Sequence, residues 1–251
     1  MGEGSGREIG GSEIEDVSPP SVHVAPVSRV SPVPSEPSAP VKPLLRGVSH
    51  QVFFFVAIVA TAVLVVRAGS SPASTAALVF GATLVLLLGT SACYHRISWS
   101  PVARQRMRRM DHAAIFMLIA GGYTPLFALV PSPSGGHGAL AAIWIGAGVG
   151  VVKSLAWPHA PKWLTALLCV AIGWMVIFQV MGRTPMVGST CVGLLVASGV
   201  TYSVGALVYA LKRPDPWPRV FGYHEIFHLL VVVASGFLFA HVSLVIRAVT
   251  T

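Results

Sequence analysis

Seven long apolar runs follow one another between residue 44 and the C-terminus, and short loops containing Gly, Pro and Ser separate most of them. Each run is close to the roughly twenty residues that an α-helix needs to cross about 30 Å of hydrocarbon. We place the runs at about 48–66, 74–95, 111–130, 138–156, 161–181, 188–211 and 222–246. Because short connections favour antiparallel neighbours, the pattern predicts an all-α membrane protein built as a seven-transmembrane helix bundle.

Residues 1–43 follow a different pattern. They hold eight of the nineteen prolines, with Ser, Gly and Glu between them, and they lack the apolar stretch of a signal peptide. A segment of this composition cannot bury a core. We therefore expect a disordered, proline-rich, acidic tail over 1–43 and a seven-helix transmembrane domain over 44–251, whose first run stays in place as an anchor.

The composition supports the membrane assignment. Hydrophobic residues make up 54% of the chain and charged residues 10%, whereas soluble domains carry about 25% charged residues. The net charge of +8 combines an acidic tail with a basic remainder, whose only acids are Asp111, Asp215 and Glu225. Because the basic residues stand between apolar runs, membrane orientation explains them better than nucleic acid does, and we expect no nucleic-acid partner.

The basic residues also predict how the bundle is oriented. With the tail inside the cell, the cytoplasmic side carries twelve Lys and Arg residues, against Arg67, Arg183 and Arg247 outside. Cytoplasmic loops of membrane proteins carry the excess of Lys and Arg. We therefore expect a multi-pass protein of the cell membrane with a cytoplasmic N-terminus and an external C-terminus.

The last apolar run opens with Gly222-Tyr223-His224-Glu225-Ile226-Phe227-His228. Two histidines four residues apart on a helix lie about 40° and about 6 Å from each other, so both imidazoles can reach one metal ion. Ionisable side chains are costly in lipid, and a pair just inside an apolar run favours a functional interpretation. The same residues match the short His-Glu-x-x-His signature of zinc proteases, in which the glutamate is the general base.

Other polar residues reach the same end of the predicted bundle. The second run ends with Ser91 and His95, which share a helix face at four-residue spacing, and the third run begins at Asp111. With the orientation above, these residues and the pair His224 and His228 lie in one leaflet at similar depth. The orientation rests on Lys and Arg residues alone, so the shared depth of these other residues is independent of it. This shared depth predicts one site near the cytoplasmic face.

Three imidazoles beside a carboxylate suit zinc, with the fourth coordination position open to water as in catalytic sites. In this hypothesis the metal ligands are His95, His224 and His228. Asp111 orients the water or accepts its proton, and Ser91 hydrogen-bonds to Asp111, to the water or to a substrate oxygen.

Simpler interpretations remain open for these residues. Histidines at helix ends are often only interfacial, and Asp111 can instead cap the third helix while its charge pairs with Arg108 or Arg109. We expect the run from Arg96 to Arg109 to be a solvated loop near anionic headgroups. The three cysteines are expected to be buried free thiols, and five further histidines are weaker candidates for the site: His50, His112, His137, His159 and His241.

Three segments together resemble the hemolysin III family, the bacterial branch of the progestin and adipoQ receptor superfamily that includes the adiponectin receptors. They are Ser91-Ala92-Cys93-Tyr94-His95, the stretch from Asp111-His112-Ala113-Ala114-Ile115-Phe116 to Tyr123-Thr124-Pro125, and Gly222 to His228. The resemblance covers about residues 44–251. It implies zinc bound by three histidines in a seven-helix bundle, an aspartate beside the water on the metal and a serine one turn before the first histidine: His95, His224, His228, Asp111 and Ser91.

The related alkaline ceramidases hydrolyse a lipid amide, so the resemblance implies a zinc-dependent hydrolase that acts on membrane lipids in membrane homeostasis. One alternative is a non-catalytic, receptor-like regulator of membrane state in which zinc joins the helices. Another is a membrane-perturbing hemolysin, although the spans carry few polar residues that would line an aqueous path. An intramembrane protease is the least favoured, because Glu225 is ordinary within the family's motif. No feature of the sequence identifies a partner for the tail.

Overall fold

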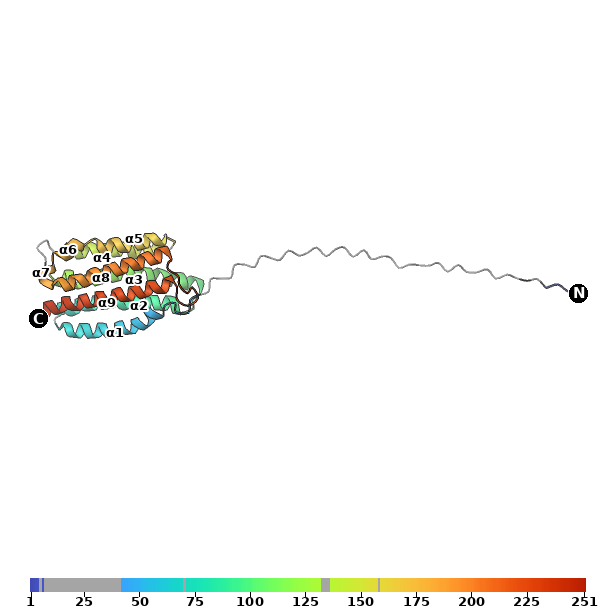
Figure 1. Cartoon of the computed structure of the whole chain (residues 1–251), viewed down its shortest axis with the longest axis horizontal. Coiled ribbons are helices and arrows are strands. Elements are labelled where there is room, and N and C mark those ends of the chain that lie inside the picture. Colours follow the sequence, from blue (N-terminus) through green and yellow to red (C-terminus); the bar gives the residue numbers. More distant parts are fainter. Residues whose placement is uncertain (5, 7–41, 70, 132–135, 158) are drawn as a thin grey trace. The chain divides into compact units, whose positions relative to one another are not determined.

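The computed structural model describes residues 1–4, 6, 42–69, 71–131, 136–157 and 159–251. Most of the predicted tail lies outside these residues. The compact unit over Pro40–Thr251 is helical, and among its described residues the one β-bridge joins Trp217 to Phe221. Figure 1 shows the helices, which are α1 (Val48–Ala68), α2 (Ser71–Arg96), α3 (Pro101–Leu129), α4 (Gly136–Ala156), α5 (Lys162–Trp174), α6 (Ile177–Met181), α7 (Thr184–Val187), α8 (Ser189–Leu211) and α9 (Tyr223–Thr250).

Among the described residues, seven helices are long and apolar enough to cross a membrane. They coincide with the seven predicted runs, and α5 and α6 count together as the single span Trp163–Met181. The all-α, seven-span architecture is therefore confirmed, while the orientation of its two ends stays a prediction.

The third span begins ten residues earlier than the apolar pattern predicts. Ser100 caps α3 by accepting a hydrogen bond from the Ala103 N–H at 3.4 Å, and Pro101 occupies the first turn, where its missing N–H costs nothing. The run Arg104–Arg109 is therefore helical, and the prediction of a solvated loop was wrong, since arginine is a good helix former. Asp111 lies inside α3, so the alternative that it caps this helix was also wrong.

The fifth span is interrupted, although the sequence pattern predicts one helix over 161–181. The helix α5 ends at Trp174 and α6 starts at Ile177. The Tyr123 hydroxyl of α3 donates a hydrogen bond to the Gly173 carbonyl, the acceptor that a continuous helix would use for residue 177. A side chain that takes the place of a backbone i→i−4 hydrogen bond in this way is a common cause of a helix break.

Three helices form the centre of the bundle. In the most apolar window of α2, α3 and α9, 56%, 56% and 50% of the residues are buried, against 17–28% in the other four spans. The outer helices expose large apolar side chains such as Phe55, Ile145 and Phe178. Exposed apolar faces of this kind are expected where lipid is the solvent.

Small residues let the central helices approach one another. A Cβ on Gly81 would collide with Thr61 of α1, and a Cβ on Gly121 would collide with Thr83 of α2; glycines at crossings are typical of membrane bundles. The helix α2 ends where α3 and α9 begin, so their polar residues meet at one end of the bundle. The C-terminus of α9 lies beside α7 at the other end (Figure 1).

Candidate metal centre

The loop before α9 fixes where its first turn begins. Glu225 Oε2 accepts a hydrogen bond from the Gly222 N–H at 2.8 Å, and Asp215 Oδ1 accepts one from the Tyr223 N–H at 2.9 Å. Both bonds satisfy N–H groups that a helix start leaves free. The other Glu225 oxygen pairs with Arg46, just before α1. Glu225 is thus buried with both oxygens engaged, which leaves the protease alternative without its general base.

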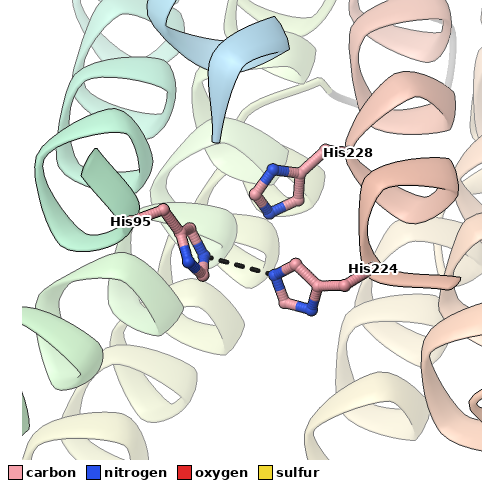
Figure 2. Close-up of side chains that lie close together, drawn as sticks. All are labelled: His95, His224 and His228. Carbon is pink, nitrogen blue, oxygen red and sulfur yellow. Dashed lines mark hydrogen bonds between the residues drawn. The ribbon is translucent and has the colours of Figure 1, made fainter. Parts of the chain in front are cut away.

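Three histidines converge on one another, as Figure 2 shows. His95 comes from the last turn of α2, and His224 and His228 come from the first turns of α9. Their ring centroids lie 4.5–4.8 Å apart, and the Nε2 atoms of His95 and His224 are 3.2 Å apart. Among the described residues, these three, which we call the histidine cluster, form the one group of His, Cys, Asp and Glu side chains placed to hold a metal ion.

The donor atoms of the histidine cluster fit an ion such as zinc. Imidazole nitrogens bind zinc at about 2.0–2.1 Å, so two ligands of a tetrahedral ion are about 3.3 Å apart. The Nε2 atoms of His95 and His224 already have this spacing. All three ligand atoms lie within 4.8 Å of one another, so the widest pair needs at most about 1.5 Å of ring movement. His95 and His228 are buried, and His224 is partly buried.

His50, in the first turn of α1, adjoins the histidine cluster, although the sequence indicates only a weaker candidate at this position. Its ring stacks on His228 with 4.0 Å between centroids and 8° between planes. The His50 Nε2–H donates to the His228 carbonyl oxygen at 3.2 Å, while His50 Nδ1 is buried without a hydrogen-bond partner. His50 therefore restricts rotation of the His228 ring. The sequence feature that could have identified His50 is its position at the start of the first apolar run, at the same depth as the histidine cluster.

Asp111 and Ser91 lie together on the cavity wall beside the cluster. Ser91 is buried one turn before His95 and lines the same cavity as Asp111. A hydrogen bond from the Ser91 hydroxyl to the Asp111 carboxylate stays a prediction. His112 Nδ1 lies 3.7 Å from that carboxylate and donates to the Arg108 carbonyl at 2.8 Å. The structure thus places both predicted residues at the site, and their catalytic role stays a prediction.

Tyr209, near the end of α8, also reaches the site, and the sequence pattern does not identify it. Its ring lies edge-on to His224 at 5.8 Å between centroids and packs on Phe227 at 5.0 Å. Tyr209 and Asp111 both line the same cavity. Tyr209 therefore connects the carboxylate side of the site to the histidine side.

A cavity of about 560 Å³ adjoins the cluster. Its polar end includes the three histidines, Ser91 and Asp111, and its walls farther along are apolar, with Leu118, Ile119 and Leu238 among them. Because Leu238 lies fourteen residues after His224 on α9, the cavity follows that helix for about 21 Å. Its volume is typical of a small-molecule site.

Two other described histidines, His159 and His241, are not members of the histidine cluster. His241 is fully buried farther along α9, and the exposed His159 lines the mouth of the cavity, while the His137 side chain lies outside the described part of the chain. Cys191 is buried, but Cys93 is exposed, so the expectation of three buried thiols was wrong. Cys93 stands two residues before His95 and faces away from the site, toward the outside of the bundle.

Comparison with known proteins agrees with this architecture. A model of the haemolysin-III-related family matches residues 39–239. The chain is 28% identical over 199 residues to hemolysin-3 of Bacillus cereus, covering 78% of this chain and 88% of that protein. It is 26% identical over 199 residues to a hemolysin-3 homolog of Bacillus subtilis (strain 168), covering 78% and 90%.

A more distant similarity connects the chain to animal proteins. It is 24% identical over 198 residues to an adiponectin receptor protein of Drosophila melanogaster, covering 63% of this chain and 40% of that protein. The seven apolar helices and the bacterial relatives together indicate a multi-pass bacterial membrane protein. Because the family model matches most of its length, the chain belongs to the haemolysin-III-related family.

Proposed function

We propose that this protein is a zinc-dependent hydrolase of membrane lipid amides, with the ion held by His95, His224 and His228. The main support is that the three imidazoles converge at the polar end of a cavity whose other walls are apolar. A lipid whose acyl chain follows the apolar walls brings its amide carbonyl to the polar end. Converging polar groups in a mostly apolar pocket are typical of such sites.

The chain's own residues account for the proton transfers. When bound, the ion supplies Lewis-acid chemistry that activates water and stabilises negative charge on a carbonyl oxygen. Asp111 accepts a proton from water as the water oxygen bonds to the carbonyl carbon. Asp111 then returns the proton to the amide nitrogen as the C–N bond breaks, which yields a carboxylic acid and an amine. Ser91, which lines the same cavity, holds the Asp111 carboxylate in place by donating a hydrogen bond to it.

The proposal places the site at the cytoplasmic face and the C-terminus outside. Basic residues gather at the site end of the bundle, including Arg46, Lys153 and the four arginines between residues 104 and 109, which supports this orientation. This orientation is tested in whole cells with a variant that carries a cysteine at position 251 in place of Thr251 and no other accessible cysteine. Labelling by a membrane-impermeant maleimide is expected, and labelling only after the cells are opened would contradict the orientation.

A second candidate is a receptor-like regulator in which the ion is structural. This role is favoured by the origin of the ligands, because His95 on α2 and His224 on α9 come from helices far apart in sequence. An ion that binds only the folded state stabilises it by mass action without turnover. The name hemolysin-3 of two relatives suggests membrane perturbation as a third candidate. The exposed apolar side chains of the outer helices fit lipid contact better than a water-filled path.

Substitution of Asp111 by Asn separates the first two candidates. The hydrolase predicts that Asp111→Asn keeps its metal but loses about 10²–10⁴-fold in turnover of ceramides and other lipid amides, because the proton acceptor is gone. Metal content and released fatty acid are measured on the same purified sample. Retained metal with unchanged turnover would remove Asp111 from catalysis. If the metal-loaded wild-type protein releases no fatty acid from any of these lipid amides, the result would favour the structural role of the ion.

A further inference from the structure

The polar end of the cavity carries an excess of positive charge. Six Lys and Arg side chains line the cavity, against the single carboxylate of Asp111 among the described residues. The six are Lys42, Arg46, Arg104, Arg108, Arg109 and Lys153. They come from the segment before α1, from the first turns of α3 and from the last turn of α4, all at the end that holds the histidine cluster. Clefts lined by one sign of charge concentrate ligands of the opposite sign.

Arg109 differs from other cations of this group. Arg46 pairs with Glu225, and Lys153 donates a hydrogen bond to Thr165 Oγ1. The Arg109 Nε, in contrast, is buried and has no hydrogen-bond partner in the described part of the protein. A buried donor without an acceptor is costly and calls for an explanation. Because Arg109 also lines the cavity, other donors of its guanidinium group can meet a ligand oxygen there.

The cations before α1 and on α3 also lie close enough to repel one another. Partial burial, together with the positive charges of Arg104, Arg96 and Arg46, lowers the pKa of Lys42. An anion bound between these groups would relieve that repulsion. The charge arrangement therefore favours a negatively charged ligand over a neutral one at this end of the cavity.

The other part of the cavity excludes a purely polar ligand. Its walls include Ile115, Leu118, Leu195 and Leu238, and it follows α9 for about 21 Å beyond His224. An apolar space of this length suits an acyl chain, whose burial is favourable along its whole length. The ligand that fits both parts is an amphiphile with an anionic head.

We infer that the cavity binds lipids whose headgroup carries a phosphate, with the phosphate beside Arg109 and an acyl chain along the apolar walls. This substrate class rests on the proposed lipid function, although binding itself needs no turnover. Arginine presents a planar set of donors that matches phosphate oxygens, and such charge-assisted hydrogen bonds are about twice as strong as neutral ones.

The general preference of cytoplasmic loops for basic residues does not explain which cations enter the cavity. Arg106 stands on the same helix, three residues before Arg109, but it is exposed and does not line the cavity. Lys212 and Arg213, in the loop after α8, are likewise exposed outside it. These residues can meet surface headgroups. They provide charge-matched controls for the cations inside.

Ceramide and ceramide 1-phosphate test the inference, because they share the amide and the chains and differ in the phosphate. Binding is measured with full-length, zinc-replete Asp111→Asn protein in an uncharged detergent, so that neither lipid is consumed. We expect ceramide 1-phosphate to bind about tenfold or more tightly than ceramide. Arg109→Gln is expected to remove most of this preference, whereas Arg106→Gln keeps it within about twofold.

Several outcomes would overturn the phosphate-lipid inference. One is equal affinity for the two lipids, and another is an equal effect of Arg106→Gln and Arg109→Gln, which would indicate surface charge alone. Inorganic phosphate that binds as tightly as the phospholipid would indicate a site for the free ion. Lys153→Gln, with metal content as the check on folding, gives a second variant if Arg109→Gln is unstable. Cleavage by the wild-type protein is assayed separately, so failure of hydrolysis and failure of phosphate recognition are distinguishable.

Discussion

Two buried histidines of α9, His228 and His241, differ in what surrounds them. His228 belongs to the histidine cluster, and His241 lies thirteen residues farther along the helix, about 20 Å away. Their exposed fractions are nearly the same, 2% and 0%. The His241 Nδ1–H donates to the Cys191 carbonyl at 2.9 Å, and the Cys191 Sγ lies 3.3 Å from the same nitrogen.

The difference shows that burial alone does not identify a functional histidine. The His241 ring donates its hydrogen bond to the backbone carbonyl of Cys191, and neither residue lines the cavity. In the histidine cluster, ring nitrogens face one another, and the cavity gives a ligand access to them. Convergence of donor atoms beside an open space is therefore the feature that supports a metal site.

The largest expected difference between the histidine cluster and His241 is in metal content. Replacing His224 and His228 by Ala removes two of three ligands, so the purified protein is expected to lose essentially all of its metal and its turnover. Replacing His241 by Ala is expected to leave about one ion per chain. Plasma mass spectrometry of both variants, purified in parallel, measures the effect. Equal metal content in the two variants would break the comparison.

The fold is largely readable from the sequence because lipid imposes a strong pattern. Runs of about twenty apolar residues locate all seven spans. The start of α3 at Pro101 escapes this pattern because the arginines of its first turns lower the hydropathy, although Ser100 and Pro101 are ordinary helix-start signals. The break after Trp174 depends on a hydrogen bond from Tyr123, fifty residues away, and no local pattern records such a contact.

The sequence predicts the candidate site only in part. The spacing of His224 and His228, and the shared depth of His95 and Asp111, are properties of the sequence, and the structure brings these residues to one cavity. The stacking of His50 on His228 depends instead on how α1 packs against α9. The depth argument applies to His50 as well, but depth alone does not say which face of a helix meets the site.

His50 provides the next largest test, because it extends the histidine cluster beyond its three candidate ligands. His50→Ala removes both the ring stacked on His228 and the hydrogen bond to its carbonyl. Loss of a group that orients a ligand typically lowers metal affinity about 10–100-fold. Competition with a chelator of known zinc affinity measures this, and His50→Phe is expected to recover part of the loss by restoring the stack. If His50→Ala leaves the zinc affinity unchanged, His50 does not contribute to the metal site.

A smaller effect is expected at Ser91, which positions Asp111. Ser91→Ala removes the proposed hydrogen bond to the carboxylate but no ligand, so turnover is expected to fall about tenfold while metal content stays constant. The matched control is Thr90→Ala, whose hydroxyl bonds to the Leu86 carbonyl of its own helix and is expected to change turnover less than about twofold. The two variants are compared by kcat/KM and by metal content. An equal effect of both would argue against a positioning role for Ser91.

The smallest expected effect concerns the Cys191–His241 pair, and it is on stability. His241→Phe removes the hydrogen bond to a buried carbonyl, which is expected to cost about 1–3 kcal/mol and to lower the midpoint of thermal unfolding. Metal content and turnover per folded molecule are expected to stay constant. Thermal unfolding followed by tryptophan fluorescence in detergent measures the shift. A loss of metal in this variant would show that the two ends of α9 are coupled.

X-ray absorption at the zinc edge of the purified, metal-replete protein tests the central claim most directly. Three imidazoles sharing one ion predict a first shell of nitrogen and oxygen ligands at about 2.0–2.1 Å, with the outer-shell scattering that histidine rings produce. The same spectrum from the His224→Ala, His228→Ala double variant is expected to contain no bound zinc signal. A sulfur shell at about 2.3 Å, or a wild-type protein that retains no ion, would contradict the account.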